Sequence, residues 1–133
     1  MTTRDELLAL AARVEAAGAS AELDAEIAFA TGWQFRFDQH DDDLTEETWI
    51  SPDGREHASP PAYISSIDAA MSLVPEGHEW GCGHKDATGK PWAWVGRPEE
   101  RRVDWNPMSI ANASSPAAAL ASASLKAIAE TMK

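Results

Sequence analysis

The sequence predicts one α+β domain over residues 1–133, arranged as a three-layer α/β/α sandwich with a small antiparallel sheet. The first observation is periodicity, because some segments repeat apolar residues at helical spacing while others alternate apolar with polar residues. The second is that the strand-like segments are joined by short turns, which favours antiparallel pairing. The third is that four amphipathic helices exceed what one face of a small sheet needs. We therefore expect helices on both faces of the sheet.

The N-terminal region predicts two helices. Thr3 and Glu6 have the spacing of a capping box, in which the threonine accepts a hydrogen bond from a free backbone amide. Ser20 is the expected cap of the second helix, and Gly18 and Gly32 suit the positions after each helix ends. The apolar faces are Leu7, Leu10, Ala11 and Val14 in the first helix and Leu23, Ile27 and Ala30 in the second.

The next part of the chain predicts a strand, an acidic loop and another strand. Residues 33–37 alternate aromatic and polar side chains, which indicates a strand with one buried face. Residues 38–47 are too polar to bury, so we expect a solvated loop. Thr48–Ile50 favours a short strand, and Ser51–Gly54 has the composition of a turn.

The second half predicts two helices with strands between them. Ser65 is the expected cap of the first, whose apolar face holds Ile67, Ala70, Met71 and Val74. The expected strands are 78–84 and 91–96, joined by a hairpin loop at 85–90, and a short one at 108–110. Ser115 and Pro116 predict the start of the last helix, whose many Ala and Ser residues permit close approach to a sheet.

Two segments near the middle of the chain resemble the phage ABA sandwich domain family. They are Tyr63–Ala70 and Leu73–Gly77, and Leu23–Ala28 and Ser115–Leu120 resemble the flanking helices of that family. The resemblance implies a phage or prophage protein with a layered α-β-α fold, located in the cytoplasm of an infected or lysogenic bacterium. This chain has His78 where family members often carry an aromatic residue. The family has no established activity, so the resemblance implies no catalytic residue.

Charge and composition restrict the class of partner. The net charge of −11 disfavours direct binding to the phosphates of nucleic acid. No apolar run reaches the roughly 20 residues that span a bilayer, so we expect no membrane partner. The N-terminus lacks the features of a signal peptide, and the single cysteine, Cys82, cannot form an internal disulfide. These features indicate a cytoplasmic protein.

The residues with catalytic or metal-binding potential give little support to either role. His78, Cys82 and His84 would share one face of a strand, but same-face side chains lie about 7 Å apart along it, which is loose for tetrahedral zinc. No nucleophile elbow or oxyanion device surrounds Cys82, although a hydrolase at this cysteine stays a minor hypothesis. We therefore predict no enzyme activity, no catalytic residue, no bound metal and no cofactor.

Tryptophans and arginines gather late in the chain. Trp92 and Trp94 share one face of a predicted strand, and three arginines and Trp105 follow closely. Such a set can stack a base and bind phosphate, although tryptophans also fill cores and arginines also pair with neighbouring carboxylates. The candidate ligand-binding residues are Trp92, Trp94, Arg97, Arg101, Arg102 and Trp105.

Two functional hypotheses follow, and a structural virion component is a minor third. The first is a phage accessory protein, active in counter-defence, that sequesters a small nucleotide-type ligand and forms a homo-oligomer. The alternative is an acidic inhibitor that occupies a host nucleic-acid-binding or defence protein. Its candidate interaction residues are Asp41, Asp42, Asp43, Glu46 and Glu47.

Overall fold

The computed structural model describes residues 2–17, 20–39, 45–97 and 109–132. In chain order the elements are α1 (Arg4–Ala16), α2 (Ala21–Ala30), β1 (Gln34–Gln39), β2 (Thr45–Ile50), β3 (Glu56–His57), α3 (Ile67–Met71), β4 (Glu79–Gly83), β5 (Trp92–Gly96), β6 (Ser109–Asn112) and α4 (Pro116–Glu130). All the strand pairs are antiparallel, so the predicted α+β class is confirmed. The strands form two three-stranded sheets, whereas the sequence predicted one.

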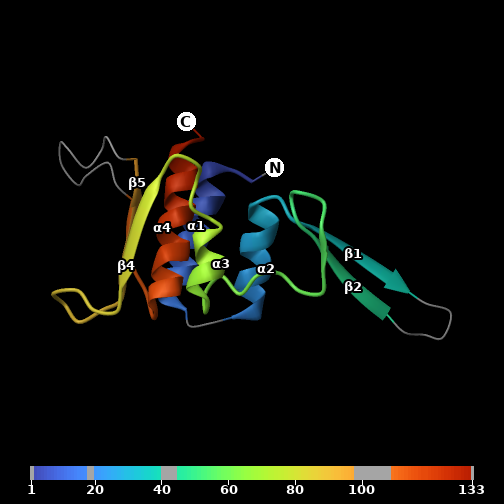
Figure 1. Ribbon diagram of the computed structural model, residues 1–133, viewed down its shortest axis with the longest axis horizontal. Coiled ribbons are helices and arrows are strands. Elements are labelled where there is room, and N and C mark those ends of the chain that lie inside the picture. The colour runs from blue at the N-terminus through green and yellow to red at the C-terminus, as the bar shows by residue number, and fades with distance from the viewer. Residues whose placement is uncertain (1, 18–19, 40–44, 98–108, 133) are drawn as a thin grey trace.

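Helix α4 lies at the centre of the fold. Figure 1 shows the sheet β4–β5–β6 along one side of α4, with α1 and α3 on its other side. Every residue from Ala117 to Leu125 is buried, because α4 meets neighbours all around its axis. Small side chains allow this close approach, and the Ser122 hydroxyl donates to the carbonyl oxygen of Ala11 in α1 at 3.2 Å. The predicted small-residue helix therefore forms the centre of the core.

Each helix begins at a side-chain cap, as the sequence predicted. Thr3, Ser20 and Ser115 accept hydrogen bonds from the amides of Glu6, Leu23 and Ala118, at 3.1 to 3.2 Å. The third helix is displaced by one residue, because Ser66 rather than Ser65 accepts from the amide of Ala69. Helix α3 is only five residues long and leaves Ile67 and Met71 exposed, so its predicted apolar face is only partly buried.

The hairpin β1–β2 extends away from the helices (Figure 1). Its register runs from Gln34 opposite Ile50 to Gln39 opposite Thr45, so the strands continue into the stretch predicted to be a loop. The prediction of one buried face was wrong for Phe35 and Phe37, which are 40% and 57% exposed. The reason is that the helices reach only the base of the hairpin, where Phe29 of α2 contacts Trp49 with ring centroids 5.0 Å apart.

The sheet β4–β5–β6 has one face against α4. Ala93, Val95 and Ala111 are buried there, whereas Trp92 and Trp94 alternate with them and point to the other side. The predicted shared face of Trp92 and Trp94 is confirmed. None of the helices in the described residues is long and apolar enough to span a membrane.

Candidate functional site

The outer face of the sheet β4–β5–β6 carries a pair of tryptophans that lie over glycines. Trp94 is paired with Gly81 and Trp92 with Gly83, across the β4–β5 ladder. A Cβ atom placed on Gly81 would lie 2.6 Å from Nε1 of Trp94, and one on Gly83 would lie 2.5 Å from Nε1 of Trp92. Each indole therefore occupies the space of the missing side chain and lies across the backbone of β4.

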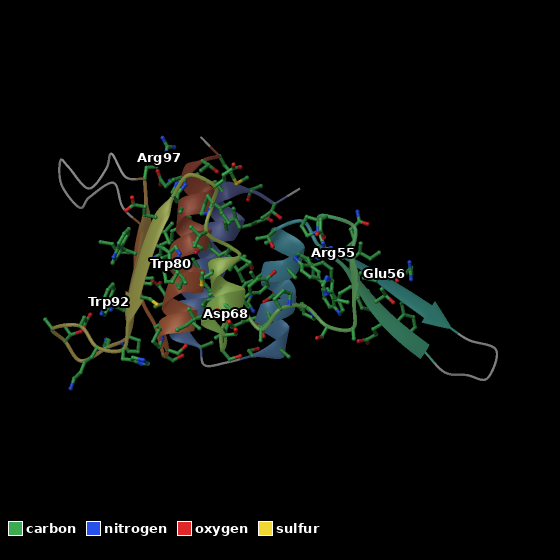
Figure 2. All side chains as sticks on the ribbon, in the orientation of Figure 1. Arg55, Glu56, Asp68, Trp80, Trp92 and Arg97 are labelled. Atoms are coloured by element: carbon green, nitrogen blue, oxygen red, sulfur yellow. The ribbon has the colours of Figure 1, made fainter. Side chains whose placement is uncertain are left out.

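This arrangement gives the sheet an aromatic surface on its outer face. An aromatic ring that covers a glycine on an edge strand replaces the packing that the glycine lacks. Both indoles lie on the outer face of the sheet, away from the face that carries Ala93 and Val95. Figure 2 shows Trp92 on the side of the sheet away from the helices and Trp80 on the side that faces them. We call the surface formed by Gly81, Gly83, Trp92 and Trp94 the tryptophan platform.

Strand β6 extends the platform on the far side of β5. Ile110 lies opposite Trp94 and is 49% exposed, and Asn112 lies opposite Trp92. Glu79 stands opposite Gly96 at the other end of β4, so a carboxylate lies on the same face as the indoles. The platform is thus an aromatic and aliphatic surface with polar groups at its margins.

Asp86 lies in the loop that joins β4 to β5, at the Trp92 end of the platform, and its carboxylate holds that loop in place. Its Oδ1 accepts hydrogen bonds from the amide and hydroxyl of Thr88 and from the amide of Lys90, at 2.5 to 3.0 Å. Its Oδ2 accepts from Nδ2 of Asn112 at 2.8 Å, which ties the loop to β6. These donors, the Thr88 hydroxyl foremost, hold the pKa of Asp86 far below its usual range. Sequence reasoning missed this residue, although an aspartate two residues before a threonine is a known turn pattern.

The other predicted ligand-binding residues are not brought onto the platform. Arg97 follows β5 and lines a cavity of about 20 Å³ with His78, Ser109 and Glu130, near the C-terminal end of α4. Figure 2 shows Arg97 at the end of the sheet rather than over its outer face. Arg101, Arg102 and Trp105 lie outside the described residues, in the connection between β5 and β6.

Two of the predicted protein-interaction residues, Glu46 and Glu47, belong to β2. Glu47 is exposed and lies opposite Phe37 in the ladder. The backbone of Glu46 is in β2, opposite Asp38. Asp41, Asp42 and Asp43 lie outside the described residues.

Cys82 does not form a catalytic arrangement with the nearby histidines. Its side chain is on the inner face of β4, opposite Ala93, and packs against the core. Burial raises the pKa of its thiol, which disfavours the thiolate. His84 is exposed beyond the strand, and the Nδ1 atom of His78 lies 3.3 Å from the carbonyl oxygen of Glu76. Among the described residues, no three histidine, cysteine, aspartate or glutamate side chains form a group that could hold a metal ion.

A pocket of about 490 Å³ lies between the base of the hairpin and the segment that follows α3. Its lining includes Trp33, Pro52, Tyr63 and Leu73. Tyr63 is almost fully buried, and burial raises the pKa of its phenol despite hydrogen bonds from the side chains of Thr31 and Trp33. Sequence reasoning did not identify this pocket, because its lining residues are spread over several separate segments of the chain.

Comparison with known protein families, curated proteins and solved structures finds no match to this chain. The resemblance of residues 63–77 to the phage ABA sandwich family therefore stays a prediction.

Proposed function

We propose that this chain is a phage or prophage accessory protein that acts by binding, and that its tryptophan platform stacks the base of a small nucleotide-type ligand. Sequestering such a ligand would deprive a host defence system of its signal. The observation that carries the proposal is the position of the Trp92 and Trp94 indoles over Gly83 and Gly81. The phage setting rests on the resemblance of residues 63–77 alone.

The position of both indoles on the outer face of the sheet supports ring stacking as the binding interaction. Base–aromatic stacking contributes about 1–3 kcal/mol per base, and it needs a flat aromatic face turned to the ligand. The side chains of β4 opposite the indoles are only hydrogens, so no side chain of that strand stands between the rings and the backbone. Because both tryptophans are fixed on one strand, binding requires little ordering of the protein.

The negative charge of the ligand needs cations, and Lys85 and Lys90 belong to the loop at the Trp92 end of the platform. Arg97 is turned to the end of α4. Arg101 and Arg102 belong to the connection that leaves β5 and returns as β6, the two strands that carry Trp94 and Ile110. We assign them the role of phosphate anchors on the basis of this position in the chain.

The experiment is titration of the purified protein with adenosine monophosphate, guanosine monophosphate and cyclic dinucleotides, followed by tryptophan fluorescence and calorimetry. Trp92→Ala and Trp94→Ala should each weaken binding of the tightest of these by roughly 10- to 100-fold, from the loss of one stacking partner. Arg101→Ala with Arg102→Ala should abolish it while the circular dichroism spectrum stays unchanged.

Trp33→Phe is the matched control, because Trp33 lies at the base of the hairpin and not on the platform. It should bind as the wild type does. If none of the nucleotides binds at millimolar concentration, or if the two platform variants bind with full affinity, the proposal fails. Native mass spectrometry of protein purified from bacterial cells then tests for a ligand of another mass.

A protein partner is the second candidate, favoured by the extension of the β1–β2 hairpin away from the helices (Figure 1). The segment 38–47 of this hairpin contains six acidic residues and neither Lys nor Arg. A complex of this kind should weaken steeply with salt, and neutralising Asp41, Asp42 and Asp43 should weaken it further.

A further inference from the structure

The aromatic face of the β1–β2 hairpin is only partly covered. Trp49 is buried and contacts Phe35 with ring centroids 5.1 Å apart. Phe37 lies one pleat further along the same face and is 57% exposed. Two large aromatic rings therefore meet solvent on an element that extends away from the core (Figure 1).

Strand β1 is also an edge strand that is neither short nor interrupted by proline. It is six residues long, lacks proline, and has β2 as its only partner among the described strands. The opposite edge of the same sheet, β3, is two residues long and is soon followed by Pro60 and Pro61. Short edges and prolines prevent strand addition, whereas a long edge with exposed aromatic residues favours it. The two edges of this sheet thus differ in the property that controls self-association.

Most of the hairpin is a ribbon of only two strands. Strand β3 pairs with Trp49 and Ile50 alone, so β2 from Thr45 to Thr48 has only β1 beside it among the described strands. An isolated two-stranded ribbon is marginally stable in water, and a third strand with a shared apolar face stabilises it. A strand that paired with the outer edge of β1 would supply this third strand.

We propose that β1 pairs antiparallel with β1 of a second copy of this chain, around a two-fold axis at Phe37. In this register Phe37 faces Phe37, and Arg36 of each copy faces position 38 of the other, which is an aspartate. A register centred on Arg36 would instead place two arginines opposite each other, and like charges directly opposite are destabilising. The charges of β1 thus favour the register centred on Phe37 over the one centred on Arg36, and the aromatic faces of the two hairpins become continuous.

Charge also favours this geometry over a parallel one. Each copy carries a net charge of −11, and six of its acidic residues fall in the segment 38–47. In the antiparallel pair only Phe37 faces its own counterpart, whereas an in-register parallel pair would place each charged residue of β1 beside the same residue of the other copy. A two-fold axis also makes the contact self-limiting, which gives a closed dimer rather than a fibre. The inference does not depend on the tryptophan platform.

Sedimentation velocity over a range of concentrations tests the proposal. The wild type should be a dimer at about 100 μM, and Phe37→Lys should raise its dissociation constant by about a hundred-fold, because two ammonium groups then meet at the axis. Met71→Lys is the control, since Met71 on α3 is exposed to a similar degree as Phe35, at 40%. It should leave the dimer intact. A monomeric wild type, or a dimer that persists in Phe37→Lys, would overturn the proposal.

A charge exchange tests the register. Arg36→Asp should weaken the dimer by placing two carboxylates opposite each other, and Asp38→Arg should weaken it by placing two guanidinium groups together. The double variant should restore the dimer, although it still lacks the ion pair between Arg36 and Glu56. If the double variant dimerises no better than Arg36→Asp alone, this register is wrong.

Discussion

The indole of Trp94 occupies the space that a side chain on Gly81 would fill, with Nε1 only 2.6 Å from the position of a Cβ atom. The glycine on the edge strand and the tryptophan on the central strand are therefore one packing unit. Trp92 and Gly83 form the same unit one pleat away.

We expect Gly81→Ala and Gly83→Ala to displace the indole that lies above each glycine. The new methyl group overlaps ring atoms, so the expected loss of unfolding free energy is about 1–3 kcal/mol. The near-ultraviolet circular dichroism of the tryptophans should change as well. Gly54→Ala is the control: it strains a backbone with φ of 88° but meets no atom within 4 Å, so only stability should fall. An unchanged tryptophan spectrum in Gly81→Ala would contradict the stacked geometry.

Asp86 should make stability depend on pH. Its folded pKa is depressed, so the stability it provides is complete above its unfolded pKa of about 3.9 and is lost as pH falls toward the folded value. Asp86→Asn should therefore lower the melting temperature at pH 7, and the difference from the wild type should narrow below pH 4. Thermal melts at several pH values between 7 and 2.5 measure this. A constant difference across the range would show that the charge of Asp86 contributes nothing.

Two buried serines of α4 should respond in opposite ways to removal of the hydroxyl. Ser122→Ala removes the hydrogen bond to the carbonyl oxygen of Ala11 and should destabilise by about 1 kcal/mol. The Ser124 hydroxyl has no hydrogen-bond partner within the part of the chain that the structure describes. Ser124→Ala should be neutral or stabilising, because it removes a buried polar group. Urea denaturation gives the free energy of unfolding of both variants. Equal losses of this free energy in Ser122→Ala and Ser124→Ala would contradict the prediction.

Cys82 should react slowly with iodoacetamide at pH 7. Burial raises the pKa of its thiol, and the thiolate is the reactive form. We expect a rate about tenfold or more below that of the same protein in urea. Labelling followed by mass spectrometry gives both rates. A native rate equal to or above the denatured rate would revive the hypothesis of a nucleophilic cysteine.

Features that depend on neighbouring residues were predictable from the sequence. The caps at Thr3, Ser20 and Ser115 are local, since donor and acceptor are separated by three residues. The shared face of Trp92 and Trp94 follows from strand alternation alone. Asp86 could also have been found by its spacing to Thr88, although its bond to Asn112 could not.

Features that depend on which segments meet were not predictable. Alternation shows that Phe35 and Phe37 share a face, but not that the helices cover only the base of their hairpin. The division of the strands into two sheets depends on the same long-range contacts. The packing of Trp94 over Gly81 requires the register of β4 against β5, which neither strand encodes by itself.

The position of α4 has a consequence for how the chain acquires its structure. Helix α1 and the sheet β4–β5–β6 both bury their apolar faces against α4, which comes after all of them in the sequence. A nascent chain that has been synthesised only as far as Ser115 lacks the helix against which Leu7, Val14, Ala93 and Val95 are buried. Contacts between α1 and α4 span more than 100 residues, and such long loops slow folding. The apolar faces of α1 and of the sheet β4–β5–β6 therefore lack this covering helix until α4 emerges, and a chain interrupted before it would expose the faces that now form the core.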